Sequence, residues 1–159
     1  MRQRSPGSVI EVRRPAGEDE LEQALELRRT VFVDEQGVSL SAERDGRDSE
    51  GLHLVALEHG RVVGTCRLML ASAPGGRGSG GLEVRLGRLA VAPAWRRRGI
   101  ASALLGAAER EARAAGAERI VLHAQTYACR LYAAAGYRRR GSTFMEEGME
   151  HVAMERPLA

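Results

Sequence analysis

The sequence predicts a single α/β domain built on a mixed β-sheet. An apolar run, a helical pattern and a second apolar run follow one another between Leu86 and Gln125, and strand–helix–strand units of this kind pair in parallel with a right-handed crossover. Earlier in the chain, two β-rich runs meet at His59-Gly60, which is typical of an antiparallel hairpin. The length of 159 residues suits one domain with its own hydrophobic core.

Hydrophobic periodicity and turn residues set the order of the elements. A flexible tail over 1–7 precedes a domain over 8–159. Within that domain we expect, in order, a strand over 8–14, a helix within 17–32, a polar loop over 38–51, hairpin strands over 53–60 and 61–70, a Gly/Ser-rich loop over 71–81, a strand over 82–93, a helix over 100–116, a strand over 118–125, a short helix over 126–136 and two strands beyond 137. Gly116 is a natural end for the longest helix.

The composition excludes several classes of protein. The net charge is only +3, and every basic residue is Arg, so the arginine count alone is weak evidence for a nucleic-acid partner. The two cysteines have neither CxxC nor Cys/His spacing, so we expect no metal site. No apolar run is long enough to cross a membrane, and the polar N-terminus has no signal-peptide pattern. We therefore expect a cytoplasmic protein.

One short stretch, AWRRRGIASALL at 94–105, indicates chemistry. Three arginines and Gly99 lead from a strand into a helix, where the first backbone N–H groups lack partners and the helix dipole favours an anion. Gly99 lets the backbone approach a ligand closely, because it has no Cβ. Taken alone, the stretch favours a solvated basic loop over a nucleic-acid contact or a phosphate-binding loop.

The surrounding residues resemble the GNAT N-acetyltransferase superfamily. The run 96–101, RRRGIA, is similar to the Gln/Arg-x-x-Gly-x-Gly/Ala signature that binds acetyl-CoA in that family. Downstream, QTYACRLY at 125–132 and then Gly136-Tyr137 resemble its second motif, which is usually Asn-x-x-Ala-x-x-Leu-Tyr followed by Gly-Phe. The segments FVDEQ, HLVA, LHAQ and FMEEGMEHVAM, with Asp45 and Asp48, look like the ElaA-type branch of the family.

The resemblance implies a GNAT fold, in which a mostly antiparallel sheet splays between two central parallel strands and helices flank it. Acetyl-CoA would enter between the splayed strands, with its pyrophosphate on the arginine loop, and no metal is implied. The resemblance assigns the cofactor to Leu89, Ala90, Val91, Arg96, Arg97, Arg98, Gly99, Ile100, Ala101 and Gln125. The expected activity is N-acetyl transfer to an amine.

Two catalytic residues are predicted. Tyr132 occupies the position at which the family stabilises the departing thiolate. The base is harder to assign, since the strand position where many relatives have Glu is Arg85, and Glu83 lies at the start of that strand. Glu35, which follows an apolar helical turn, is our candidate for the base.

Four further residues are candidates for binding the acceptor. They are charged or imidazole side chains on predicted strands or near their ends: Arg88, His53, Glu146 and His151. His123 is interpreted as structural. The acceptor itself, a small-molecule amine or a protein amine, is left open.

Two other functions compete with catalysis. The fold and its cofactor site can serve a non-catalytic acyl-CoA sensor, for which the absence of a carboxylate at position 85 is the support. A nucleic-acid binder using the arginine runs 96–98 and 138–140 is opposed by the low aromatic content of 4%. We expect acetyl-CoA and an amine as partners, with no nucleic acid and no membrane, and leave a homodimer open.

Overall fold

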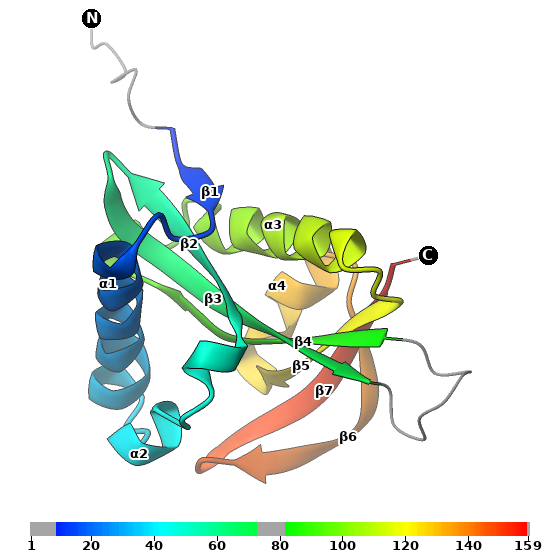
Figure 1. Cartoon of the computed structure of the whole chain (residues 1–159). Helices are drawn as coiled ribbons and strands as arrows, with labels where there is room; N and C mark the ends of the chain where they lie inside the picture. Colours follow the sequence, from blue (N-terminus) through cyan, green and yellow to red (C-terminus); the bar gives the residue numbers. More distant parts are fainter. Residues whose placement is uncertain (1–8, 73–81, 159) are drawn as a thin grey trace, which may run out of the picture. The chain divides into compact units, whose positions relative to one another are not determined.

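The computed structural model describes residues 9–72 and 82–158. Its strands form one seven-stranded mixed sheet with the hydrogen-bonded order β1-β2-β3-β4-β5-β7-β6 (Figure 1). The strands are β1 Glu11–Arg13, β2 Leu52–Glu58, β3 Arg61–Ser72, β4 Leu82–Val91, β5 Arg119–Gln125, β6 Arg138–Glu146 and β7 Met149–Pro157. The helices are α1 Glu18–Arg28, α2 Leu40–Glu43, α3 Ile100–Ala114 and α4 Cys129–Ala134. The predicted α/β fold, with β4 and β5 parallel, is confirmed.

Both tight hairpin turns follow from their residues. His59 and Gly60 join β2 to β3 with φ angles of 51° and 78°, and Glu147 and Gly148 join β6 to β7 with 50° and 76°. Two successive residues with positive φ give the turn whose twist matches paired strands. The predicted hairpin at His59-Gly60 is therefore confirmed.

The structure differs from the sequence prediction in three places. The helix predicted within 17–32 is α1 followed by a π-helical segment, η1 Arg29–Glu35. The polar segment 38–51 is not all loop, because it holds α2 and the 3-10 turn η2 Asp48–Glu50. The first strand has three residues rather than seven. The predicted tail over 1–7 and most of the loop predicted over 71–81 lie outside the described residues.

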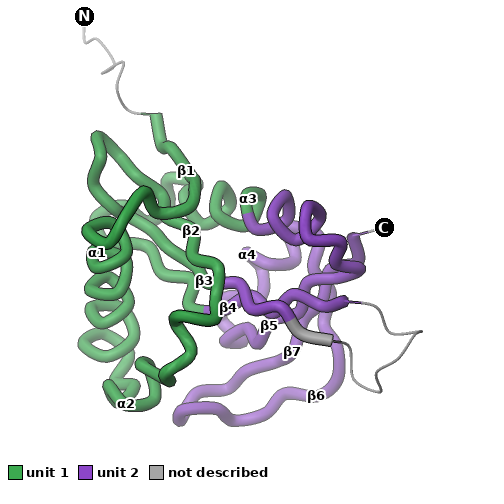
Figure 2. The backbone as a smooth tube through the Cα atoms, in the orientation of Figure 1, with its two compact units in different colours: residues 1–67, 88–107 green, residues 68–87, 108–159 purple. Residues whose placement is uncertain are grey.

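The chain divides into two compact units, coloured separately in Figure 2. Unit 1 comprises residues 1–67 and 88–107, and unit 2 comprises 68–87 and 108–159. The strands β3 and β4 and the helix α3 therefore each contribute residues to both units.

The core of unit 1 packs α1 and η1 against the sheet. Its buried members are apolar residues of the two helical segments and of β2, β3 and β4: Ala24, Leu27, Val31, Val55, Leu57, Val62 and Ala90. Burial of these side chains from water is the main favourable contribution to the stability of this layer. It also fixes η1, and with it Glu35, against the rest of unit 1.

Gly64 in β3 allows the first turns of α3 to pack closely in unit 1. A Cβ at this position would lie 2.8 Å from Ile100 Cγ2, 3.1 Å from Leu104 Cδ1 and 3.4 Å from the Ala56 Cβ. The first of these distances is too short for any side chain, so only glycine accommodates the helix where it stands. The residue thereby sets the position of the N-terminus of α3.

The core of unit 2 lies on one face of β5 and β7. Ile120, Leu122 and Ala124 alternate along β5 and are buried, and Leu122 and Ala124 pair with the buried Met154 and Val152 of β7. Because successive strand residues point to opposite faces, Val121, His123 and Gln125 lie on the other face. We call the face that carries these three residues the second face of unit 2.

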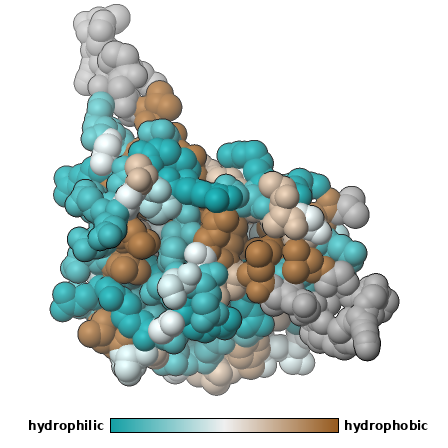
Figure 3. Space-filling model, viewed as in Figure 1, coloured by the Kyte–Doolittle hydropathy of each residue, from teal (hydrophilic) through white to brown (hydrophobic). Residues whose placement is uncertain are grey.

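The surface carries scattered apolar side chains. On the face drawn in Figure 3, hydrophobic residues form small groups between hydrophilic ones. The large hydrophobic residues that are exposed are Val9, Leu40, Leu70, Tyr127 and Met145. Over the ranges 9–72 and 82–158, no helix combines the length and apolar character needed to span a membrane.

Candidate active site

The arginine loop of unit 1 connects the 3-10 turn η3 Pro93–Trp95 to α3. Arg97 and Gly99 have positive φ angles of 63° and 82°. The helix starts at once, since the Ala103 N–H donates to the Gly99 carbonyl oxygen at 3.0 Å. A Cβ at Gly99 would meet no protein atom within 4 Å. The loop therefore offers backbone N–H groups of a helix N-terminus beside open space, an arrangement suited to an anion.

Two of the three arginine side chains of this loop contact other residues of unit 1. Arg96 donates from Nη1 and Nη2 to the Glu35 carboxylate at 2.9 and 2.7 Å, and from Nε to the Val91 carbonyl oxygen at 3.0 Å. The Arg98 guanidinium lies 4.7 Å from the ring centroid of Trp95, within the range of a cation–π contact. Since these guanidinium groups already have partners in the protein, the backbone N–H groups are the stronger candidates for holding an anion.

Glu35, predicted as the base, is the carboxylate of this ion pair. The double hydrogen bond from Arg96 lowers the pKa of Glu35, against an opposing effect of partial burial. A carboxylate with a lowered pKa takes up a proton less readily. The role of Glu35 as a base stays a prediction, and the geometry gives the residue a second task in orienting the loop.

Arg88 has an unusual backbone conformation, with φ of 54° in the middle of β4. Its Nη2 lies 3.2 Å from the Ala42 carbonyl oxygen, 3.0 Å from the Glu43 carbonyl oxygen and 3.3 Å from Asp45 Oδ2. Positive φ is uncommon for a residue with a side chain and must be held by its surroundings. These contacts fasten β4 to the segment after α2, just before Leu89.

Arg88 belongs to a network of arginines and carboxylates in unit 1. Arg28 and Glu43 are both 1% exposed, and Arg28 Nε donates to Glu43 Oε2 at 2.6 Å. Asp48 accepts from Arg28 at 2.7 Å and from Arg67 at 2.9 Å. Burial raises the pKa of Asp48, but the hydrogen bonds and positive charges of Arg28 and Arg67 together more than offset it, so the net shift is downward.

Asp45 completes the network through Arg67. Arg67 donates to both carboxylate oxygens of Asp45, at 3.0 and 2.9 Å, and holds its pKa well below the ordinary value of 3.8. In the sequence, Asp45 and Asp48 stand out only through the resemblance to the ElaA-type branch. Their pairing with arginines 19 or more residues away leaves no periodic signal in the sequence.

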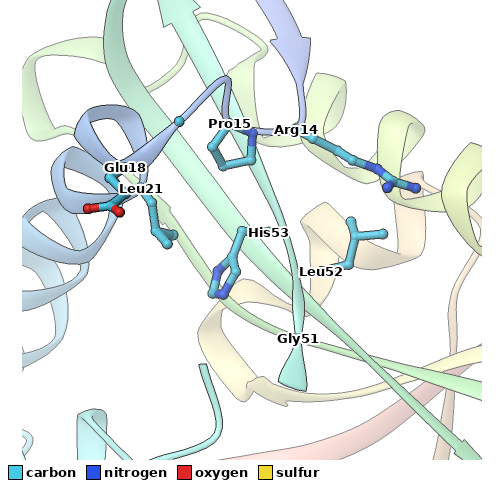
Figure 4. Close-up of a pocket in the computed structure, with 8 residues that line it drawn as sticks. Arg14, Pro15, Glu18, Leu21, Gly51, Leu52 and His53 are labelled. Carbon is cyan, nitrogen blue, oxygen red and sulfur yellow. The ribbon is translucent and has the colours of Figure 1, made fainter. Parts of the chain in front are cut away.

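His53, the other residue of unit 1 that was predicted to bind the acceptor, lines a pocket of about 510 Å³. Figure 4 shows the pocket between the start of α1, with Glu18 and Leu21, and the start of β2, with Leu52 and His53. The His53 Nε2 lies 2.9 Å from the Asp48 carbonyl oxygen, which can only accept, so this nitrogen carries the hydrogen. The ring therefore also anchors the turn that holds Asp48.

In unit 2, the pairing of β4 with β5 is short. The parallel ladder joins Glu83–Arg85 to Arg119–Val121. Both strands continue, yet among the described residues of unit 2 the ladder has no further pair over Leu86 and Gly87. The two central strands thus part after Arg85 and Val121, which is the splay that the resemblance implies.

Tyr132 is on α4 in unit 2 and is 9% exposed. Its ring meets that of Tyr137 edge to face, with centroids 6.0 Å apart. Tyr137 is 5% exposed, so the two tyrosines form a buried pair. Packing alone would account for a ring in this place, and a catalytic part for the Tyr132 hydroxyl stays a prediction.

Two histidines and a carboxylate gather on the second face of unit 2. His123 Nδ1 lies 2.9 Å from Glu146 Oε1, and the His123 ring meets Phe144 edge to face at 5.0 Å. Phe144 in turn stacks on His151, with centroids 6.0 Å apart and an interplanar angle of 21°. His151 is directly opposite Gln125 in the β5–β7 ladder. The predicted residues Glu146, His151 and Gln125 are thus brought together around His123, which sequence reasoning had taken as structural.

We looked for side chains that could bind a metal ion in the part of the chain that the structure describes. There, no three side chains of His, Cys, Asp or Glu are placed to hold an ion together. The thiols are buried as well, and burial raises the pKa of Cys66 to about 12.

The chain matches the family model of the acetyltransferase (GNAT) domain over residues 17–158. It is 30% identical to the uncharacterized N-acetyltransferase YjcF of Bacillus subtilis over 138 residues, which is 86% of this chain and 92% of that protein. An acyl-CoA N-acyltransferase structure from Pseudomonas aeruginosa is similar with a TM-score of 0.74 and 27% identity, covering 93% of this chain and 99% of the other.

ElaA of Escherichia coli is also a structural neighbour. Its TM-score is 0.76 at 23% identity, covering 93% of this chain and 99% of ElaA, a likeness of fold. The resemblance drawn from the sequence motifs is therefore confirmed for the superfamily, whose members use acyl-CoA. The family model covers nearly all of the described residues, and the chain belongs to the GNAT acetyltransferase superfamily.

Proposed function

We propose that the protein transfers an acetyl group from acetyl-CoA to a primary amine, by direct attack of the amine on the thioester. The observation that carries this proposal is the loop before α3. Its two left-handed residues and its helix N-terminus border open space, as a pyrophosphate requires.

The cofactor would be held mainly by backbone groups. The N–H groups of Arg97 to Ala101 would bind the pyrophosphate, and the strand residues Leu89 to Val91 would pair with the pantetheine arm. A strand N–H near Ala90 or Val91 would stabilise the oxyanion that forms on the carbonyl. The parting of β4 and β5 after Arg85 and Val121 supports an extended chain entering there.

The leaving group would be met by Tyr132. When the amine attacks, the C–N bond forms, the C–S bond breaks, and the sulfur departs with the electron pair. A thiol is a stronger acid than a tyrosine, so a hydrogen bond from the hydroxyl is favoured over complete proton transfer. The buried position of Tyr132 strengthens such a bond.

The proposed acceptor is a primary amine of a small molecule, and a protein amine is the alternative. Glu146 supplies a carboxylate that can accept a hydrogen bond from the amine in unit 2. His53, Arg88 and His151 are already bonded to backbone carbonyl oxygens of the protein. The carboxylate of Glu146, whose side chain is 43% exposed, is the more available of these groups.

Cofactor binding tests the proposal in thermal unfolding. CoA and acetyl-CoA should raise the melting temperature, because a ligand that binds only the folded state stabilises it by mass action. Dephospho-CoA should do so too, since the loop holds the pyrophosphate. We expect a micromolar Kd, so CoA at about 100 times that concentration should saturate the site, and an unchanged melting temperature would reject the cofactor site. A rise in melting temperature without acetylation of any amine would favour an acyl-CoA sensor.

A further inference from the structure

His123 and Glu146 form an imidazole–carboxylate pair on the second face of unit 2. Their Nδ1 and Oε1 atoms are 2.9 Å apart, and their side chains are 36% and 43% exposed. We infer that this pair is the general base of the reaction, with His123 Nε2 taking the proton of the acceptor amine. The inference rests on the proposed acetyl transfer.

The hydrogen bond fixes which nitrogen is basic. An ionised carboxylate can only accept, so the hydrogen sits on Nδ1 of His123 and Nε2 has a lone pair. The charge that the ring gains on taking up a proton at Nε2 is then stabilised by Glu146 across 2.9 Å. The pair thus has the orientation and the counter-charge that a base requires.

The ring is also held from the side. Phe144 meets it edge to face at 5.0 Å, and Phe144 is itself stacked on the buried ring of His151. The residue opposite His123 on the intervening strand is Ala153, whose methyl group leaves room for contacts to reach β6. A positioned yet solvent-accessible imidazole can both accept a proton and release it to water.

The position of His123 along β5 suits the reaction. The parallel ladder ends at Val121, so His123 stands two residues into the part of β5 that no longer pairs with β4. Under the proposed function, this is the stretch beside which the acyl chain lies. The imidazole is consequently on the strand that would border the thioester.

The other candidates for the base are engaged elsewhere. Glu35 is bonded through both oxygens to Arg96, and Glu83 is buried and paired with Arg119 at 3.2 Å. His151 is 6% exposed, and its Nδ1 lies 2.8 Å from the Met149 carbonyl oxygen. His53 likewise uses Nε2 for the Asp48 carbonyl oxygen. His123 combines exposure with an oriented lone pair.

The proton balance is simple. An alkylammonium gives one proton to His123 Nε2, and the neutral amine nitrogen that results attacks the thioester carbon. As the C–N bond forms and the C–S bond breaks, the second surplus proton on nitrogen passes through water to the departing thiolate, and His123 then returns its proton to water. Nothing is oxidised or reduced.

The test compares amines of different basicity with His123→Asn and Glu146→Gln. With an alkylamine, which is mostly protonated at neutral pH, we expect His123→Asn to lower kcat/KM by about 10²-fold or more. With hydroxylamine or a hydrazide, which are neutral at that pH, the loss should be several times smaller. Glu146→Gln should show the same dependence on amine basicity with a smaller loss.

Matched controls exist in the same chain. His59→Asn removes another histidine paired with a glutamate, Glu58 at 3.0 Å, and Glu150→Gln removes another carboxylate of the β6–β7 hairpin, which accepts from Thr126. Both should keep the wild-type kcat/KM. The affinity for CoA should be unchanged in all four variants.

The outcomes separate this inference from the proposed function. If the wild type transfers acetyl groups and His123→Asn stays within a factor of about 3, or loses activity equally with all amines, the pair is not the base. If the wild type neither binds CoA nor acetylates any amine, the proposed function fails, and the base with it. A loss confined to basic amines supports the pair.

Discussion

Arg96 joins the arginine loop to the π-helical segment by two hydrogen bonds to Glu35, at 2.9 and 2.7 Å. π-Helical turns recur at functional sites, and this one ends at the carboxylate that holds the loop. Both side chains are about 40% exposed, at 41% and 39%. Through this ion pair, Glu35 has a structural role in holding the loop, and this role can be tested separately from catalysis.

Glu35→Gln should therefore have a modest effect. An exposed ion pair contributes about 0–1 kcal/mol, and backbone N–H groups, not the Arg96 side chain, carry the phosphate in our proposal. We expect the Kd for CoA to rise by less than about 5-fold with kcat nearly unchanged, as measured by calorimetry and steady-state kinetics. A loss of kcat of about 10²-fold would instead assign the base to Glu35.

Gly99→Ala should weaken CoA binding more than it weakens the fold. The new Cβ meets no protein atom, so the cost in stability is the left-handed backbone, about 1–2 kcal/mol. Gly116→Ala is the matched control, because Gly116 follows the other end of α3 with φ of 81° and equally open space. Urea unfolding should give similar losses for the two variants, whereas only Gly99→Ala should bind CoA weakly. Equal CoA affinities would place the phosphate elsewhere.

The arginine–carboxylate network should make the free energy of unfolding depend on pH in the acid range. The folded-state pKa of Asp45 lies below its ordinary value of 3.8, chiefly through the hydrogen bonds from Arg67. Its contribution is thus fully present above that pH and is lost as the pH falls further. We expect the free energy of unfolding of Asp45→Asn to be lower than that of the wild type at neutral pH, with the gap closing below about pH 4.

The exposed Asp34 supplies the control for that measurement. Asp34→Asn should follow the wild-type dependence on pH. A gap between Asp45→Asn and the wild type that stays constant down to the acid transition would mean that Asp45 contributes through shape, not through charge.

Tyr132→Phe should separate chemistry from packing. The ring stays, so its edge-to-face contact with Tyr137 and the melting temperature should survive. If the hydroxyl stabilises the thiolate, kcat should fall by about 10²-fold with the affinity for acetyl-CoA unchanged. Tyr137→Phe, a second buried tyrosine 6.0 Å away, should keep its kcat. Equal kcat for wild type and Tyr132→Phe would leave that tyrosine a packing role only.

The fold could be predicted from the sequence because the patterns that indicate it involve residues close together in the chain. The alternation along β5, the helical spacing of α3 and the His59-Gly60 turn each depend on neighbours in the chain, and they predicted the parallel pair and the hairpin. The π-helical turn before Gln36 was not accessible, because its apolar residues keep a spacing that also fits an α-helix.

The candidate site could be predicted from the sequence only where its residues form a contiguous motif. The loop 96–101 is one such motif, whereas the partnership of His123 with Glu146 spans 23 residues and depends on the order β5-β7-β6. In the sequence His123 is one polar residue on an alternating strand, for which a structural interpretation is the ordinary one. The pairing of Arg28 with Glu43 was hidden for the same reason, since tertiary contacts bring the two together.

The most direct measurement is thiol release from acetyl-CoA in the presence of a panel of primary amines, with the acetylated product identified by mass spectrometry. Acetyl transfer predicts that CoA thiol appears at a rate that rises with amine concentration and saturates, in step with an N-acetylated amine. Thiol release that is absent, or that is the same with and without every amine, would contradict it.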